Sequence, residues 1–132
     1  KFVIKKSNGN VGIGTTTPSE KLHIADAIFP RIALLKTGIG TWYLGGDNTA
    51  NNNFNISFNS SSNFLTINSS GNLGIGTTAP AAELHVAGTG ALIVPVGTFA
   101  QRPANAVQGM IRYNTTIGKY EGYDGSAWVA LN

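Results

Sequence analysis

The strongest constraint on the fold is an internal repeat. Residues 9–24 read GNVGIGTTTPSEKLHI and residues 71–86 read GNLGIGTTAPAAELHV, so the copies lie 62 residues apart and share ten of sixteen positions. This period is longer than that of the usual solenoid repeats, which run about 20–50 residues. The repeat predicts serial modules: residues 1–70 as a first β-module, 71–100 as a second repeat segment with a connector, and 101–132 as a C-terminal β-meander.

Each copy of the repeat reads as a strand, a break and a second strand. The glycines that flank Ile75 indicate a bulge, a bend or a second backbone close by. Pro80 then ends the element, because proline cannot donate a hydrogen bond to a sheet, and β alternation resumes around Leu84. The repeat positions that we expect to shape assembly are Gly12, Ile13, Gly14, Leu22, Gly74, Ile75, Gly76 and Leu84.

The segment between the two copies reads as further short strands. Strand-like runs at 31–36 and 41–46 precede a polar loop at 47–53. Residues 54–59 alternate strictly between apolar and polar, which is typical of a half-buried strand. The run 64–67 follows after a turn, so these two segments predict a hairpin.

The C-terminal part has the pattern of an antiparallel meander. Strand-like runs at 109–114, 119–123 and 127–131 are separated by turns, and the Asp-Gly pair at 124–125 is among the strongest hairpin signals. No segment has the period of a long helix. The expected fold class is all-β, built of short-stranded, glycine-rich serial modules that end in a β-meander.

The composition suggests that one chain alone cannot cover its strand edges and bury its apolar residues. Only 11% of the residues are charged, against about 25% in a typical soluble domain. Few charges are therefore present to protect exposed strand edges, and each short strand carries only two or three large apolar residues. These features favour an intertwined homo-oligomer in which neighbouring chains complete each other's sheets. The alternative is a monomeric sandwich with its glycines in ordinary turns.

Several classes of protein do not fit the sequence. Without cysteine, the chain has no disulfide and no thiolate ligand or nucleophile. No window approaches the roughly 18 consecutive apolar residues of a membrane span. The net charge of +3 is scattered, whereas nucleic-acid binding needs a clustered basic stripe. Lys1 stands where Met would begin a chain, so we expect a processed product or a fragment.

Both repeat copies resemble the GIGTTxPxxKLHV segments of bacteriophage tail fibres and similar trimeric viral fibres. The stretch RPANAVQGMIRYNTTIGKYEGYDGSAWVAL at 102–131 resembles a second segment of such fibres. The resemblance implies a homotrimeric fibre of the virion, without a cofactor, that assembles with itself and binds a host-surface glycan or protein. A bacterial or environmental extracellular filament or adhesin is the alternative, and a carbohydrate-active enzyme is a third.

The candidate receptor-binding residues are aromatic. Aromatic rings beside amides can stack on sugar rings while the amides bind hydroxyl groups; the alternative is that these rings form the core of the meander. The candidates are Trp42, Tyr43, Tyr120, Tyr123 and Trp128.

Catalysis and metal binding have little support in the sequence. His23 and His85 occupy equivalent repeat positions and could meet a metal near a symmetry axis, but no second ligand lies at a useful spacing. The alternative is an outward-facing strand histidine. We find no paired carboxylates and no Ser-His-Asp pattern, so we expect no enzymatic activity.

Overall fold

The computed structural model describes all residues except 1, 6–8, 29, 47–52, 60–61 and 132. The described residues form strands and one short 3-10 helix, with no α-helix among them, and the all-β prediction is confirmed. Most of the predicted loop at 47–53 and part of the turn before residue 64 lie outside the described residues. The chain divides into two compact units, Lys1–Thr89 and Gly90–Asn132.

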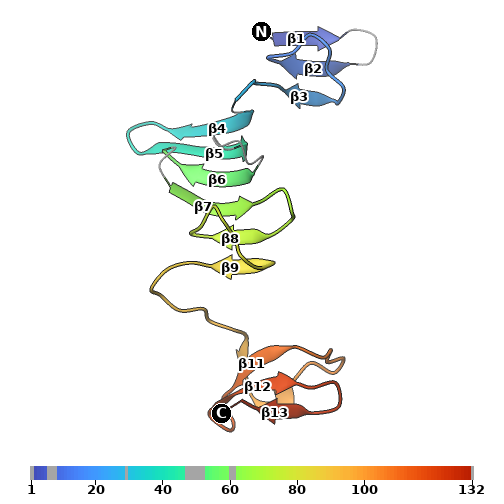
Figure 1. Cartoon of the computed structure of the whole chain (residues 1–132), viewed down its shortest axis with the longest axis vertical. Coiled ribbons are helices and arrows are strands. Elements are labelled where there is room, and N and C mark those ends of the chain that lie inside the picture. Colours follow the sequence, from blue (N-terminus) through green and yellow to red (C-terminus); the bar gives the residue numbers. More distant parts are fainter. Residues whose placement is uncertain (1, 6–8, 29, 47–52, 60–61, 132) are drawn as a thin grey trace. The chain divides into compact units, whose positions relative to one another are not determined.

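The first unit holds two sheets in which chain order is also strand order (Figure 1). The smaller sheet contains β1 (Phe2–Lys5), β2 (Asn10–Ile13) and β3 (Leu22–Ile24). The larger contains β4 (Arg31–Lys36), β5 (Gly40–Gly46), β6 (Phe54–Phe58), β7 (Ser62–Ile67), β8 (Leu73–Ile75) and β9 (Leu84–Val86). Neighbouring strands are antiparallel, except that β2–β3 and β8–β9 are parallel. The six-stranded sheet runs across residue 70, where the sequence predicted the end of a module.

The predicted hairpin of 54–59 and 64–67 is present as β6 and β7. A bulge between Ile56 and Ser57 shifts the register, so that Leu65 pairs with Ile56 and Asn63 pairs with Ser57. Phe64 is thereby left without a partner across the ladder. A bulge of this kind bends the strand and redirects a side chain.

The repeat encodes a parallel pair of strands joined by a short crossover. In each copy residues 14–21 or 76–83 carry the chain from one strand to the next, which is shorter than the dozen or more residues that parallel strands commonly need. A Cβ at Gly12 would lie 2.7 Å from the Thr15 carbonyl oxygen, and a Cβ at Gly74 would lie 2.5 Å from the Thr77 carbonyl oxygen. The first glycine of GIG therefore makes room for the backbone of the crossover.

Side chains fasten both crossovers to their sheets. The Asn10 amide donates to the Pro18 carbonyl at 3.2 Å in the first copy, and the Asn53 amide donates to the Thr78 carbonyl at 3.3 Å in the second. The backbone N–H groups of Ser19 and Ala81 each donate to Nδ1 of the histidine four residues later, at 3.3 Å. The crossover and its histidine contact therefore recur in both copies, whereas the two asparagine contacts are not equivalent, because Asn53 lies outside the second copy.

The second unit is one four-stranded sheet. It contains β10 (Val96–Gly97), β11 (Ile111–Asn114), β12 (Lys119–Tyr123) and β13 (Trp128–Ala130), with the 3-10 helix η1 (Phe99–Gln101) after β10. The pairs β11–β12 and β12–β13 are antiparallel, as the meander prediction required. The sequence did not predict β10, which adds to β11 in parallel.

The described part of the chain contains no fully buried large apolar side chain. All strand pairs with substantial contact are neighbours within one sheet. The side chains that are buried are polar or charged: Asn10, Asn53, Asn55, Ser57, Thr66, Arg112, Asn114 and Glu121. A sheet normally buries its apolar face against a second layer. Where the large apolar side chains lie, and what could cover them, therefore bears directly on function.

Candidate functional site: an apolar face and a pocket

The large apolar side chains of the first unit gather on one face of its sheets. Residues opposite each other in a ladder share a face, and side chains alternate along each strand. By this register one face of the six-stranded sheet is apolar on all six strands. Its members, which we call the apolar face, are Ile32, Leu34, Trp42, Leu44, Phe54, Ile56, Phe58, Leu65, Ile67, Leu73, Ile75, Leu84 and Val86.

The apolar face is open to solvent in the isolated chain. Leu34 is 58% exposed, Leu84 is 53% exposed, and Trp42 and Phe54 are each 44% exposed. Monomeric proteins rarely expose contiguous apolar patches larger than a few hundred Å². A face this large is typical of an interaction surface.

On β6, β7 and β8 the opposite face of the same sheet carries small and polar side chains. Asn55, Thr66 and Gly74 lie side by side on β6, β7 and β8, and all three are buried. The crossover covers them, since the Thr77 carbonyl lies on the side to which a Cβ of Gly74 would point. The chain itself therefore covers the opposite face at β6–β8 and leaves the apolar face bare.

Two of the buried polar groups lack a hydrogen-bond partner in the described structure. Neither amide atom of Asn55 nor Oγ1 of Thr66 is bonded. These residues are direct cross-strand partners. Buried polar groups are usually satisfied by a hydrogen-bond partner, so this cross-strand pair is an exception among the described residues.

The smaller sheet continues the same pattern. Ile4, Val11 and Leu22 are aligned across β1, β2 and β3, and so are Ile13 and Ile24 on the last two strands. A hollow lined by Leu22 and Ile24 of this sheet and by Ile32, Leu44 and Phe54 of the larger sheet lies where the two apolar surfaces meet. Both sheets of the first unit therefore present apolar side chains around one hollow.

The structure separates two aromatic candidates that adjoin in the sequence. Trp42 belongs to the apolar face, where its ring centroid lies 5.2 Å from that of Phe58 and 5.5 Å from that of Phe64. Tyr43 points to the opposite face, where the Arg31 guanidinium carbon lies 4.1 Å from the centre of its ring. Trp42 and Tyr43 therefore do not form one binding site.

The second unit contains a charged cluster beneath η1. The Glu121 carboxylate is fully buried, accepts two hydrogen bonds from Arg102, and accepts one from Arg112 at 3.2 Å and one from the Asn114 amide at 2.9 Å. The Arg102 hydrogen bonds are the main reason that the pKa of Glu121 lies below its usual range, and those from Asn114 and the charge of Arg112 add to the effect. The Arg112 Nη1 also donates to the Thr98 carbonyl at 3.2 Å.

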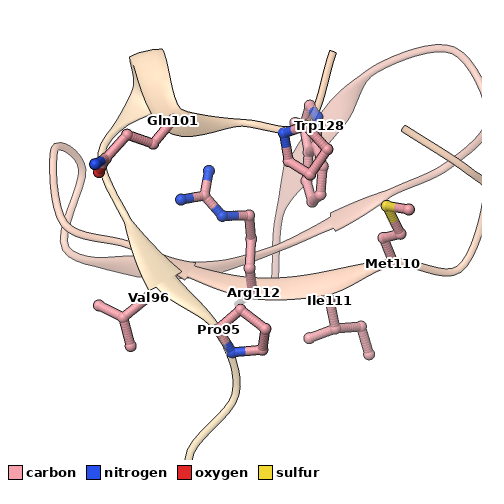
Figure 2. A pocket seen from close by; sticks show the side chains of 8 residues that line it. Pro95, Val96, Gln101, Met110, Ile111, Arg112 and Trp128 are labelled. Atoms are coloured by element: carbon pink, nitrogen blue, oxygen red, sulfur yellow. The ribbon is translucent and has the colours of Figure 1, made fainter. Parts of the chain in front are cut away.

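A pocket of about 510 Å³ lies beside this cluster. Figure 2 shows the guanidinium group of Arg112 between Gln101 and Trp128, with Pro95, Val96 and Ile111 on the other side of the β10–β11 corner. The lining is mostly apolar and is formed by Pro95, Val96, Gln101, Pro103, Met110, Ile111, Arg112 and Trp128. A largely apolar hollow with a few polar groups is the usual form of a small-molecule site.

The C-terminal aromatic candidates also divide between two faces. Trp128 pairs with Tyr123 on the face that carries the charged cluster, with ring centroids 5.5 Å apart. Tyr120 lies on the other face, with an edge-to-face contact to Tyr113 at 5.1 Å. Of the five aromatic candidates, Trp128 alone lines this pocket.

Arg102, Arg112 and Glu121 were not among the residues predicted from the sequence. Arg112 alternates with Ile111 and Tyr113, and Glu121 lies between Tyr120 and Gly122. Alternation of this kind places the apolar residues inward and the charges outward, so the pattern did not mark a buried ion pair.

The histidine candidates lie in the strands that follow the crossovers, His23 in β3 and His85 in β9. Nδ1 of each accepts a backbone hydrogen bond, from Ser19 to His23 and from Ala81 to His85. Within the described residues, no group of three or more His, Cys, Asp or Glu side chains is placed to hold a metal ion. The same residues include no helix with the length and apolar character needed to cross a membrane.

Comparison with family models and with curated proteins finds no match to this chain.

Proposed function

We propose that this chain is a structural and attachment segment of a viral tail fibre, that it assembles as a homotrimer in the virion, and that it helps to bind a host surface. The observation that supports the proposal is the apolar face: a six-stranded single-layer sheet with large apolar side chains on every strand and nothing over them in the described chain. The likeness of the repeat to segments of trimeric fibres agrees with this proposal.

A second copy of the chain is the partner that this face fits best. Lys36, at the end of β4, is the one charged residue that the strand register places on this side of the described sheet, so the face is largely complementary to itself. A sheet buries its apolar side against another layer, and modules that cannot bury their faces alone are stabilised by neighbours. Three copies that turn this face inward would form the core that the described single chain lacks.

In such an assembly the outer surface would carry out attachment to the host. With the apolar face turned inward, the crossovers and the polar side of the sheet face outward. Most side chains there are small or polar, the larger ones being Arg31, Leu35 and Tyr43, and they form the surface that would meet solvent and a host surface.

The test is the mass of the folded chain in solution, by light scattering coupled to size exclusion and by sedimentation equilibrium. The proposal expects a single species of three times 13.8 kDa that persists at low micromolar concentration. A folded monomer with cooperative unfolding would refute the homotrimer. A stable dimer would keep the self-association and refute its stoichiometry.

A further inference from the structure

We infer that the pocket of the second unit binds the carboxylate of an acidic sugar, a uronic acid residue of a surface polysaccharide. The inference rests on the attachment role proposed above and names the chemical class of the receptor. It is carried by the charge balance of the buried cluster, by the donors of Arg112 and by the lining of the pocket.

The buried cluster has one positive charge in excess. Arg102 and Arg112 both pair with Glu121, and among the described residues no other acidic side chain lies within ion-pair distance of either arginine. Two guanidinium groups against one carboxylate leave a net charge of +1. The Arg112 side chain is 6% exposed, so this charge is largely removed from water. Removing a charge from water is unfavourable unless a partner of opposite charge is present.

Two nitrogen atoms of the Arg112 guanidinium group donate no hydrogen bond to the described residues. All its hydrogen bonds to the described residues are made by Nη1, to the Thr98 carbonyl and to Glu121. Nε and Nη2 therefore have no acceptor there. A guanidinium group presents its donors in a fixed fork that matches a carboxylate, and the guanidinium of Arg112 lies at the pocket (Figure 2).

The rest of the pocket suits a sugar ring. Trp128, Met110 and Pro103 provide apolar contact for the CH face of a pyranose, and Gln101 provides an amide near its hydroxyl groups. The volume of about 510 Å³ lies within the roughly 300–1,000 Å³ of small-molecule pockets. A neutral sugar would leave the excess positive charge of the cluster without a counter-charge, so the carboxylate is the specifying group.

The pocket opens at the margin of a second apolar surface. Val96 and Ile111 line it from the face opposite the charged cluster, and they are 59% and 53% exposed. A neighbouring copy seated on these two side chains would narrow the entrance. The experiment therefore uses the full chain in its natural association state.

The experiment titrates the full chain at low ionic strength with sodium D-glucuronate, D-glucose and sodium acetate, and follows the indole N–H signal of Trp128 by NMR. Glucuronate is expected to bind with saturation, and its affinity should fall as salt is added because the contact is ionic. Acetate, which lacks the ring, should bind about tenfold more weakly or worse. Glucose binding as well as glucuronate, or no binding by glucuronate, would overturn the inference.

Two substitutions of one exposed residue at the pocket test its position and leave the charged cluster of Arg102, Arg112 and Glu121 intact. Pro103 is exposed and lines the pocket. Pro103→Glu places a competing carboxylate beside Arg112 and should weaken glucuronate binding by at least about tenfold, as expected for one charged hydrogen bond. Pro103→Gln matches it in size without the charge and should keep most of the affinity. Equal binding by the two variants would place the site elsewhere.

Failure of this inference and failure of the assembly proposal are separable. A trimer that binds no glucuronate would overturn the ligand class and leave assembly standing. A monomer that binds glucuronate would leave the pocket standing and refute the trimer. Circular dichroism of every variant shows whether the sheet is retained.

Discussion

A charge placed on the apolar face should dissociate the assembly, whereas the same charge one residue away should not. Leu34 and Leu35 are neighbours on β4 that point to opposite faces of the sheet. Leu34 belongs to the apolar face, opposite Trp42, whereas Leu35 lies opposite Thr41 on the other face. In the isolated chain both are well exposed, at 58% and 70%. Leu34→Glu and Leu35→Glu therefore form a matched pair.

The size of the effect follows from the burial that each leucine would gain. Fully burying a leucine side chain is worth about 1.5–3 kcal/mol. Leu34 is 58% exposed, so covering the rest of it contributes roughly 1–1.5 kcal/mol per copy. Leu34→Glu loses this contribution and adds an unpaired buried charge that costs several kcal/mol. Summed over three copies the loss is on the order of 10 kcal/mol, which is enough to dissociate most oligomers at micromolar concentration.

The assay is sedimentation equilibrium over a hundredfold range of concentration, with circular dichroism as the check of folding. Leu34→Glu should sediment as a dissociated and less stable chain, and Leu35→Glu should match the unchanged protein in mass. If both variants keep the mass of the unchanged protein, the apolar face is not the interface and the reasoning is wrong. If both dissociate alike, the face selectivity on which the argument depends is absent.

Two further predictions concern the crossover and the charged cluster. Gly74→Ala should destabilise the first unit by about 2 kcal/mol or more, because the new Cβ meets the Thr77 backbone, while Gly90→Ala, with open space around it, should change the melting temperature little. The folded-state pKa of Glu121 is lowered, so its contribution to stability is complete above the ordinary glutamate pKa of about 4.3 and is lost as the pH falls below that value. The melting temperature of the unchanged protein should therefore fall between pH 6 and pH 3. At pH 6 the free energy of unfolding of Glu121→Gln should be lower by the roughly 3–5 kcal/mol of a broken buried ion pair. The melting temperature of this variant should then fall less in acid. An equal drop in both proteins would contradict this assignment of the acid sensitivity.

Local patterns in the sequence predicted those strands that pair with near neighbours. Alternation from residue 54 onward and the Asp-Gly pair at 124–125 identified the β6–β7 hairpin and the C-terminal meander. In each case one short turn joins the partners, so pattern and pairing lie in the same stretch of chain. The bulge after Ile56 was not predicted, because no residue nearby distinguishes it from continued alternation.

The parallel pairs could not be predicted in the same way. The strand at Leu84 shows alternation, but nothing in its own residues says that it lies parallel to β8 rather than antiparallel to another strand. The glycines of GIG predicted a bulge, a bend or a second backbone close by, and the structure shows a second backbone, the crossover at Thr15 and Thr77. The pairing follows only from knowing where the crossover lies.

The polar residues buried in the first unit and the bare apolar face have a common cause. The crossover backbone lies against the sheet at Gly74, and the side chains of Asn55 and Thr66 are buried beside it. Little space remains there for leucine or phenylalanine. Alternation along the strands then places the large apolar residues on the other face, where no part of the described chain covers them.

The 62-residue repeat therefore extends an uncovered apolar face and does not build a core within the described chain. Each copy closes a sheet with the same crossover, and each leaves its apolar residues, such as Leu22 and Leu84, on the uncovered side. Adding modules of this kind lengthens the apolar face without ever covering it. Among the described residues nothing covers this face, and in the assembly proposed above the same face of another copy would bury it. The low charge of the chain is then expected, because charges on this face would oppose the contact.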